Sequence, residues 1–123
     1  MPTESPWPAQ WLRGVLEICV LAVIEEGTTY GYALAQRLET AGLGRIKGGT
    51  LYPILLRLEQ DGLVTAAWGE GSGGPGRKFY EITPAGSTEL QRRRRDWAAF
   101  TATTNGLLGA PGAHHHPEEA HRA

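Results

Sequence analysis

The chain has 123 residues, which is enough for one domain and too few for two ordinary ones. Lys and Arg number 12 and Asp and Glu 13, and the resulting net charge of −1 excludes a histone-like basic protein and an acidic disordered tail. Hydrophobic residues make up 41% of the chain, so we expect a buried core. The single cysteine, Cys19, excludes an internal disulfide and favours the cytoplasm. Membrane association is not expected, because the longest apolar run, 15–24, is shorter than the roughly 20 residues that span a bilayer.

The first predicted helix covers about residues 11–26. Its segment from Val15 to Ile24 is apolar on nearly every side, so the helix must be buried on more than one face. In so short a chain, the second covering surface suggests a partner subunit. Gly27 is the expected end of this helix.

Two shorter helices are predicted next, over about 30–40 and 49–61. Thr28 or Thr29 would cap the start of the first one, and Gly42 and Gly44 would end it. In the second one, apolar residues recur at the helical spacing of a core face, at Leu51, Ile54, Leu55 and Leu58.

Two strand-like runs, 63–68 and 78–83, flank the glycine-rich stretch GEGSGGPGR, which predicts a hairpin. Thr83 and Pro84 then start a fourth helix that should reach about Asn105. Three helices followed by a hairpin is the order of a winged helix-turn-helix domain. We therefore predict a mainly α fold with a small β-hairpin. The winged helix would cover 10–86, a dimerisation helix 87–105, and flexible tails 1–9 and 106–123.

The third helix and the hairpin carry residues suited to DNA. The helix face opposite the core is small, polar or cationic, and a major groove about 12 Å wide admits one helix. Cations on the hairpin could reach phosphates or the minor groove. A solvated helix face and a loop with incidental charges are the alternative interpretations. The candidate DNA-binding residues are Lys47, Thr50, Tyr52, Arg57, Arg77 and Lys78, with Tyr30 and Tyr32 bracing the second helix and one of them touching a phosphate.

Four sequence blocks resemble the PadR family of bacterial transcriptional regulators. They are YGY at 30–32, GTLYP at 49–53, LRLEQDGLV at 56–64 and RKFYEITPAG at 77–86. The resemblance covers about residues 12–86 and implies a dimeric winged helix that usually represses transcription, with the C-terminal helix as the dimer element. The run Arg92–Arg95 is more basic than expected for such a helix. A solvated surface, phosphate contact and salt bridges to a partner's acidic residues all remain open for it.

The fourth helix has an imperfect heptad pattern, since Leu90, Trp97 and Thr104 are spaced seven apart, as are Arg93 and Phe100. This spacing predicts a dimer contact. The residues expected at the dimer interface are Trp97, Leu90, Phe100, Val15 and Cys19. The resemblance further makes Trp97 a candidate contact for a small aromatic effector, and plain dimer packing is the alternative.

No catalytic residue, cofactor or metal site is predicted. Residues 69–74 match GxGxxG, but a strand-like run follows where a phosphate-binding loop would open a helix. The histidines at 114, 115, 116 and 121 lie in the C-terminal tail, where metal binding would be adventitious. No Ser–His or Cys–His pair is placed by the predicted fold, and Cys19 has the surroundings of a buried inert thiol.

The sequence therefore predicts a sequence-specific DNA-binding transcriptional regulator. We expect a homodimeric repressor that binds double-stranded operator DNA and is released by an effector. The alternative is a ligand-binding or protein-interaction winged-helix dimer without DNA-binding activity. Salt-sensitive retention on heparin would distinguish the two, because an interaction module would elute early.

Overall fold

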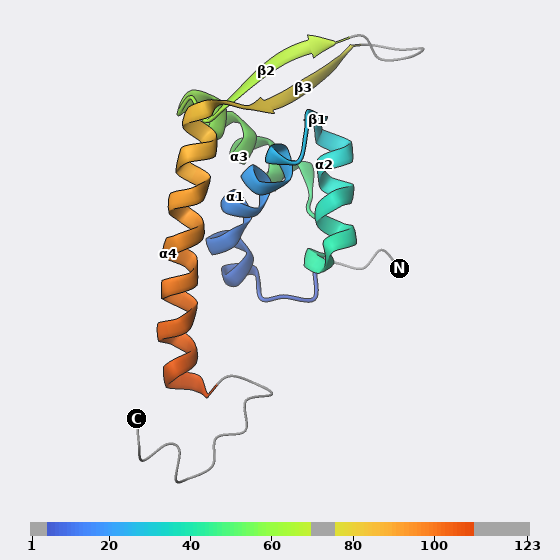
Figure 1. Ribbon diagram of the computed structural model, residues 1–123. Helices are drawn as coiled ribbons and strands as arrows, with labels where there is room; N and C mark the ends of the chain where they lie inside the picture. The colour runs from blue at the N-terminus through green and yellow to red at the C-terminus, as the bar shows by residue number, and fades with distance from the viewer. Residues whose placement is uncertain (1–4, 70–75, 110–123) are drawn as a thin grey trace. The chain divides into compact units, whose positions relative to one another are not determined.

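The computed structural model describes residues 5–69 and 76–109. It confirms the predicted fold class, a mainly α chain with a small sheet and a C-terminal helix (Figure 1). The described chain divides into two compact units between Gln91 and Arg92, inside the last helix. The elements in chain order are α1 (Ala9–Glu25), β1 (Thr29–Tyr30), α2 (Gly31–Leu38), a π-helical turn η1 (Glu39–Leu43), α3 (Gly48–Gln60), β2 (Val64–Gly69), β3 (Arg77–Ile82) and α4 (Pro84–Leu108).

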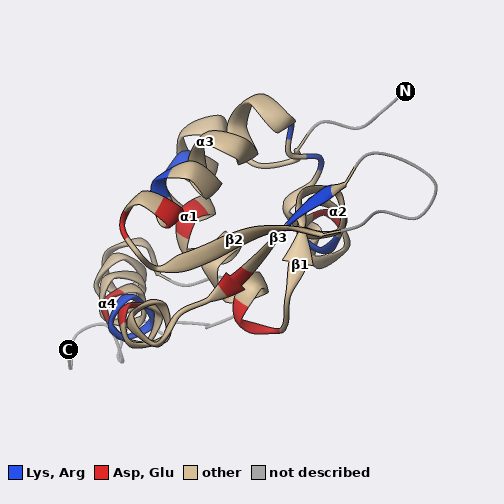
Figure 2. Cartoon of the chain, turned by 90° about the horizontal axis from the view of Figure 1, so that it is seen from above, with Lys and Arg blue, Asp and Glu red and all other residues tan. Residues whose placement is uncertain are grey.

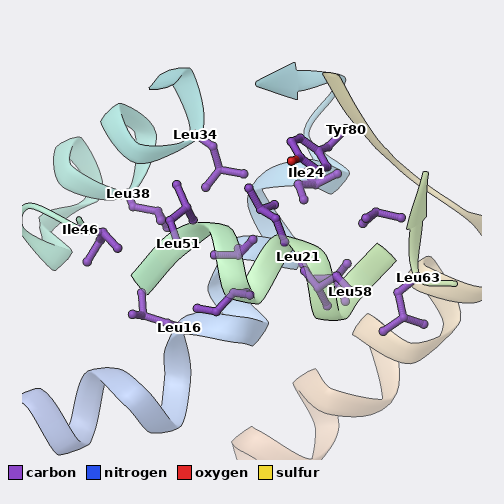
Figure 3. Close-up of a cluster of buried hydrophobic side chains, with 14 of the residues drawn as sticks. Leu16, Leu21, Ile24, Leu34, Leu38, Ile46, Leu51, Leu58, Leu63 and Tyr80 are labelled. Carbon is purple, nitrogen blue, oxygen red and sulfur yellow. The ribbon is translucent and has the colours of Figure 1, made fainter. Parts of the chain in front are cut away.

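The core of the first unit lies among α1, α2 and α3. Leucine and isoleucine side chains from the three helices point toward one another there (Figure 3). The predicted core face of α3 is confirmed, since all four of its residues are buried: Leu51, Ile54, Leu55 and Leu58. Helix α1 buries four apolar residues in the core, Leu16, Val20, Leu21 and Ile24. Six more of its apolar side chains are only half-buried, namely Leu12, Val15, Ile18, Cys19, Ala22 and Val23. The predicted surplus of apolar surface on this helix is therefore present.

The sheet has three antiparallel strands in the order β1–β3–β2. The β2–β3 hairpin is the predicted one, and its tip at residues 70–75 lies outside the described residues. Strand β1 was not predicted. Thr29 pairs with Tyr80 and Tyr30 with Phe79, because the free edge of β3 accepts a short strand. Thr28 and Thr29 therefore do not cap α2. Tyr30 occupies that position, and its side chain makes no capping hydrogen bond among the residues that the structure describes.

Several element ends agree with the sequence, and others do not. Gly42 and Gly44 have positive φ angles of 110° and 85° and end the second helical stretch as expected. The hydroxyl of Thr83 accepts a hydrogen bond of 2.9 Å from the backbone N–H of Gly86, as a helix N-cap does. Helix α4 continues to Leu108, so residues 106–108 are helical and not part of a tail. The segment before α1 is also held, by hydrogen bonds from Ser5 and Trp7.

The remaining predicted tail residues, 1–4 and 110–123 with their four histidines, lie outside the described residues. Among the described helices, none combines the length and the apolar character needed to cross a membrane.

Candidate nucleic-acid interface

Helix α3 exposes one face while the opposite face fills the core. Thr50, Tyr52 and Pro53 lie on the exposed face, next to two exposed glycines at the start of the helix. Lys47 occupies the N-cap position and is also exposed. The start of α3 is therefore accessible and cationic, and its small residues allow close approach of a large ligand.

A groove runs between the start of α2, α3 and the β2–β3 hairpin. It brings together five of the predicted DNA-binding residues, Tyr30, Tyr32, Tyr52, Arg77 and Lys78. It is also lined by Leu56 and Trp68. A neighbouring hollow beside the start of α3 contains Lys47 and Arg45 together with Glu39. Residues far apart in the sequence thus form one continuous face, on which the Lys and Arg positions before α3 and at the start of β3 are visible (Figure 2).

One glycine and one hydrogen bond help to place two tyrosine side chains of this groove, Tyr52 and Tyr32. Tyr52 packs directly on Gly31, where a Cβ atom would collide with its hydroxyl, so any larger residue there would push the Tyr52 ring aside. A Cβ at Gly48 would stand 3.4 Å from the ring of Tyr52, which is ordinary contact. The hydroxyl of Tyr32 accepts a hydrogen bond of 3.0 Å from Nε2 of Gln36. Gly31 therefore lets the Tyr52 side chain of α3 lie directly on the start of α2.

The two hairpin cations have different surroundings. The guanidinium of Arg77 stands 4.4 Å from the ring centroid of Tyr30, which in turn packs edge-on against Phe79 at 5.6 Å. Nζ of Lys78 forms an ion pair of 3.3 Å with Oε1 of Glu59. Lys78 also lies 5.8 Å from the ring centroid of Tyr80. Burial raises the pKa of Tyr80, although the charge of Lys78 opposes that shift, so this hydroxyl stays protonated at neutral pH.

Arg57 is placed differently from the other candidates. Its Nε donates a hydrogen bond of 2.9 Å to Oε2 of Glu17, so its guanidinium pairs with α1. The side chain is 54% exposed. Arg57 does not line the groove that holds the tyrosines and Arg77. Arg57 therefore stays a predicted DNA contact on α3, and in this structure its charge is paired with Glu17.

Comparison with known proteins matches this arrangement to one family. The model of the transcriptional regulator PadR-like family matches residues 20–92. The chain belongs to the PadR family. A PadR-like transcriptional regulator from Bacillus cereus has 37% sequence identity and a TM-score of 0.72, over 82% of this chain and 98% of that one. A PadR family transcriptional regulator from Eggerthella lenta gives 35% identity and a TM-score of 0.75, over 81% and 87%.

A transcriptional regulator of Mycobacterium tuberculosis is 35% identical over 86 residues, which cover 70% of this chain and 78% of that protein. The resemblance predicted from the sequence is thereby confirmed. The protein is a transcriptional regulator of the PadR family.

One of the residues predicted for a dimer interface of this PadR-family protein is buried in the core, and the other four are at least partly exposed. Leu90 is fully buried in the core of the first unit, so it is unavailable to a second subunit, and its assignment to the interface is wrong. Trp97 and Phe100 are 44% and 61% exposed on α4, with ring centroids 6.0 Å apart. Val15 and Cys19 are half-buried on α1. Burial raises the pKa of the Cys19 thiol, as expected for an inert cysteine.

Two further residues line the groove of this PadR-family protein, Leu56 and Trp68. The sequence marked Leu56 only as an outward-facing residue suited to a protein partner, and it gave Trp68 no role. Both are large apolar side chains that remain exposed, at 53% and 75%. Trp68 stands opposite Lys78 in the hairpin register. The sequence itself indicates that Leu56 is exposed, because it falls outside the Leu51/Ile54/Leu55/Leu58 row that forms the core face of the same helix.

Proposed function

We propose that this PadR-family regulator binds double-stranded operator DNA through the groove face of its winged helix, residues 10–86. Helix α3 would enter the major groove of one half-site, and the β2–β3 hairpin would lie on the flanking backbone. The main support for this proposal is that the exposed start of α3 and the hairpin cations lie on one face. The exposed start of α3, with Lys47, adjoins the groove that holds Arg77 and Lys78.

The division of roles follows from the chemistry of each side chain. Lys47, Arg77 and Lys78 offer charge to phosphates, and such contacts position a protein on DNA without reading sequence. Thr50 and Tyr52 stand on the exposed face of α3, where hydroxyl and aromatic groups can reach base edges. Tyr30 joins the start of α2 to the hairpin through its contacts with Arg77 and Phe79, and Tyr32 would brace α2 from within through Gln36. Arg57 would contribute less, because Glu17 already pairs with it.

We also propose that the protein acts as a homodimer through α4. Trp97, Phe100, Leu107 and Leu108 are exposed at helical spacing along one stripe of this helix. Exposed aromatic and leucine side chains in such a row favour burial against another protein surface. A second copy of the chain would present the same stripe, so the two copies could cover each other without a different protein. Val15 and Cys19 on α1 offer further apolar contacts.

We further propose that the bound dimer represses transcription and that an effector releases it from DNA. A dimer with both α3 helices on DNA would block access to a promoter, as the PadR resemblance implies. The indole of Trp97 offers a wide flat face, so a small aromatic effector could contact it at the dimer interface and change the spacing of the two α3 helices.

One experiment tests the DNA-binding proposal directly. The full-length protein is used to select duplexes from a random pool, and the affinity for the enriched duplex is measured by fluorescence anisotropy at 50–200 mM salt. A dimer with roughly 6–10 phosphate contacts should lose about 10³–10⁵ in affinity over this range. Lys47→Ala should weaken binding, whereas Arg13→Ala, which removes the same charge from the exposed start of α1, should not.

A protein-interaction module is the second candidate function, favoured by the exposure of Leu56 and Trp68 in the groove. It predicts the opposite outcome. No duplex would be enriched, and the protein would elute early from heparin. Either result at 50 mM salt would overturn the proposal of DNA binding.

A further inference from the structure

The segment just before α1 is tied to the connection between α2 and α3. The hydroxyl of Ser5 donates a hydrogen bond of 2.7 Å to the carbonyl of Leu43. Nε1 of Trp7 donates one of 2.9 Å to the carbonyl of Gly42. In Figure 1 the dark-blue chain before α1 runs across to the end of the α2 stretch. We call residues Ser5–Trp7 the strap.

The strap supplies hydrogen-bond donors to the carbonyl groups at the end of the second helical stretch. The last carbonyls of a helix have no intrahelical donor, and they need side chains, water or a following turn. Here side chains from 35 and 38 positions earlier in the chain provide two donors, to Gly42 and Leu43. The contact is close. A Cβ atom at Gly44 would lie 2.5 Å from Cα of Ser5, and Gly44 also has a positive φ of 85°.

The segment that the strap contacts, Gly42–Gly44, lies just before α3 in the chain. Gly44 is followed by Arg45, Ile46 and Lys47, and α3 begins at Gly48. Ile46 is buried in the core, while Arg45 and Lys47 on either side of it are exposed. The strap at Gly42–Gly44 and the core at Ile46 therefore fix the connection at two points. Together they determine where both cations stand beside the start of α3.

We propose that the strap is a positioning element for DNA binding, which presents Arg45 and Lys47 in a fixed arrangement to the phosphate backbone. This inference rests on the proposed function. A connection that is already ordered loses less conformational freedom on binding, so its contacts contribute more to affinity. Without the strap, the same cations would have to be ordered at the moment of binding.

The test compares three forms of the full-length protein. The strap variant combines Ser5→Ala with Trp7→Phe, which removes both donors and keeps an aromatic ring. Trp11→Phe is the matched control, because Trp11 is exposed on α1 four residues later. For each form we would measure affinity for the selected duplex, the salt slope of that affinity, the urea midpoint, and hydrogen exchange at residues 42–47.

The strap variant should bind about 5- to 20-fold more weakly than the wild type, a range set by the cost of ordering one or two side chains. Its salt slope should flatten by about one unit, because a loosely held cation makes a poorer phosphate contact. Exchange at residues 42–47 should be faster. The urea midpoint should fall only slightly, because water can reach the exposed carbonyl of Gly42 when the Trp7 donor is removed. Trp11→Phe should match the wild type in all four measurements.

Two results would overturn the inference while leaving DNA binding intact. One is a strap variant that binds within twofold of the wild type with the same salt slope. The other is an affinity loss that comes with a strongly lowered urea midpoint and an unchanged slope, which would show only a structural role. If the wild type itself selects no duplex, the proposed function fails and the inference fails with it, and the wild-type measurement alone shows this.

Discussion

The guanidinium of Arg77, the first residue of β3, stands 4.4 Å from the ring centroid of Tyr30, the last residue of β1. This contact joins the hairpin to the start of α2, because Tyr30 directly precedes Gly31. A cation over an aromatic face keeps its charge and its outward N–H groups while it loses freedom. Arg77 is therefore presented at the groove in a defined position, as an electrostatic contact to DNA requires.

The first prediction concerns the role of Arg77 on the hairpin. Arg77→Ala should weaken binding to all duplexes alike and flatten the salt slope by about one unit, because a phosphate contact carries no sequence information. Lys78→Ala should act in the same direction. Affinities for the selected duplex and for a scrambled one, measured by anisotropy across salt concentrations, check this. A change of sequence preference with an unaltered slope would mean that the hairpin contacts bases.

The second prediction compares two cations near α3. Lys47→Ala should cost more DNA affinity than Arg57→Ala, because Arg57 already pairs with Glu17 and lies outside the groove. Arg57→Ala should also change stability by less than about 1 kcal/mol, since the Arg57 side chain is 54% exposed. Both variants lose one positive charge, so each is the other's control for net charge. A larger affinity loss for Arg57→Ala would show that it leaves Glu17 to contact DNA.

Much of the fold follows from local patterns in the sequence. The Leu51/Ile54/Leu55/Leu58 spacing determined which face of α3 is buried, and Thr83-Pro84 marked the start of α4. Such features depend on residues three or four apart, so they are visible without knowledge of the tertiary structure.

Features set by distant residues could not be predicted in this way. Strand β1 exists because β3, whose Tyr80 pairs with Thr29, offers a free edge far along the chain, and no local signal at Thr29 shows that edge. Arg57 has an outward-facing position on α3, but Glu17, 40 residues away, decides its pairing. Leu90 fitted a heptad with Trp97, yet the core of its own unit buries it. The strap could not be predicted from the sequence for the same reason, since its acceptors are two backbone carbonyls far along the chain.

The third prediction concerns the thiol of Cys19. Burial raises its pKa, and the thiolate is the reactive form, so alkylation by iodoacetamide at pH 7.5 should be slow in the folded protein. Mass spectrometry of the folded and the urea-unfolded protein would measure both rates. Equal rates would contradict the burial of this side chain.

The same shift predicts a pH dependence of stability. A thiol whose pKa is raised in the folded state, as that of Cys19 is, contributes stability that is fully present below the ordinary thiol pKa of about 8.5. That contribution is lost as the pH rises through the folded-state pKa. Urea midpoints should therefore fall more steeply above about pH 8.5 in the wild type than in Cys19→Ala, which lacks the group. Parallel curves for the two proteins would show that Cys19 does not titrate differently on unfolding.

The fourth prediction concerns Trp97 and the proposed dimer. Its indole is 44% exposed and lies next to Phe100 on a helix that also exposes Leu107 and Leu108. If a second copy covers this stripe, Trp97→Ala should weaken the dimer by about 2–4 kcal/mol, as large-to-small substitutions do in packed interiors. By sedimentation, the variant should be monomeric at a concentration where the wild type is dimeric. Thr103→Ala is the control and should leave the dimer unchanged, because the Thr103 hydroxyl donates its hydrogen bond to the carbonyl of Ala99 in the same helix.

Fluorescence separates packing from effector binding at this residue. Variants that keep one tryptophan at a time remove the overlapping signals of Trp7, Trp11 and Trp68. The form with Trp97 alone should emit at shorter wavelength in the dimer than after unfolding, because a covered indole is shielded from water. A planar cationic dye should quench this form and leave the form lacking Trp97 unaffected. An emission typical of a hydrated indole at dimer concentrations would contradict the interface, whereas blue-shifted emission without quenching would keep the interface and exclude the effector contact.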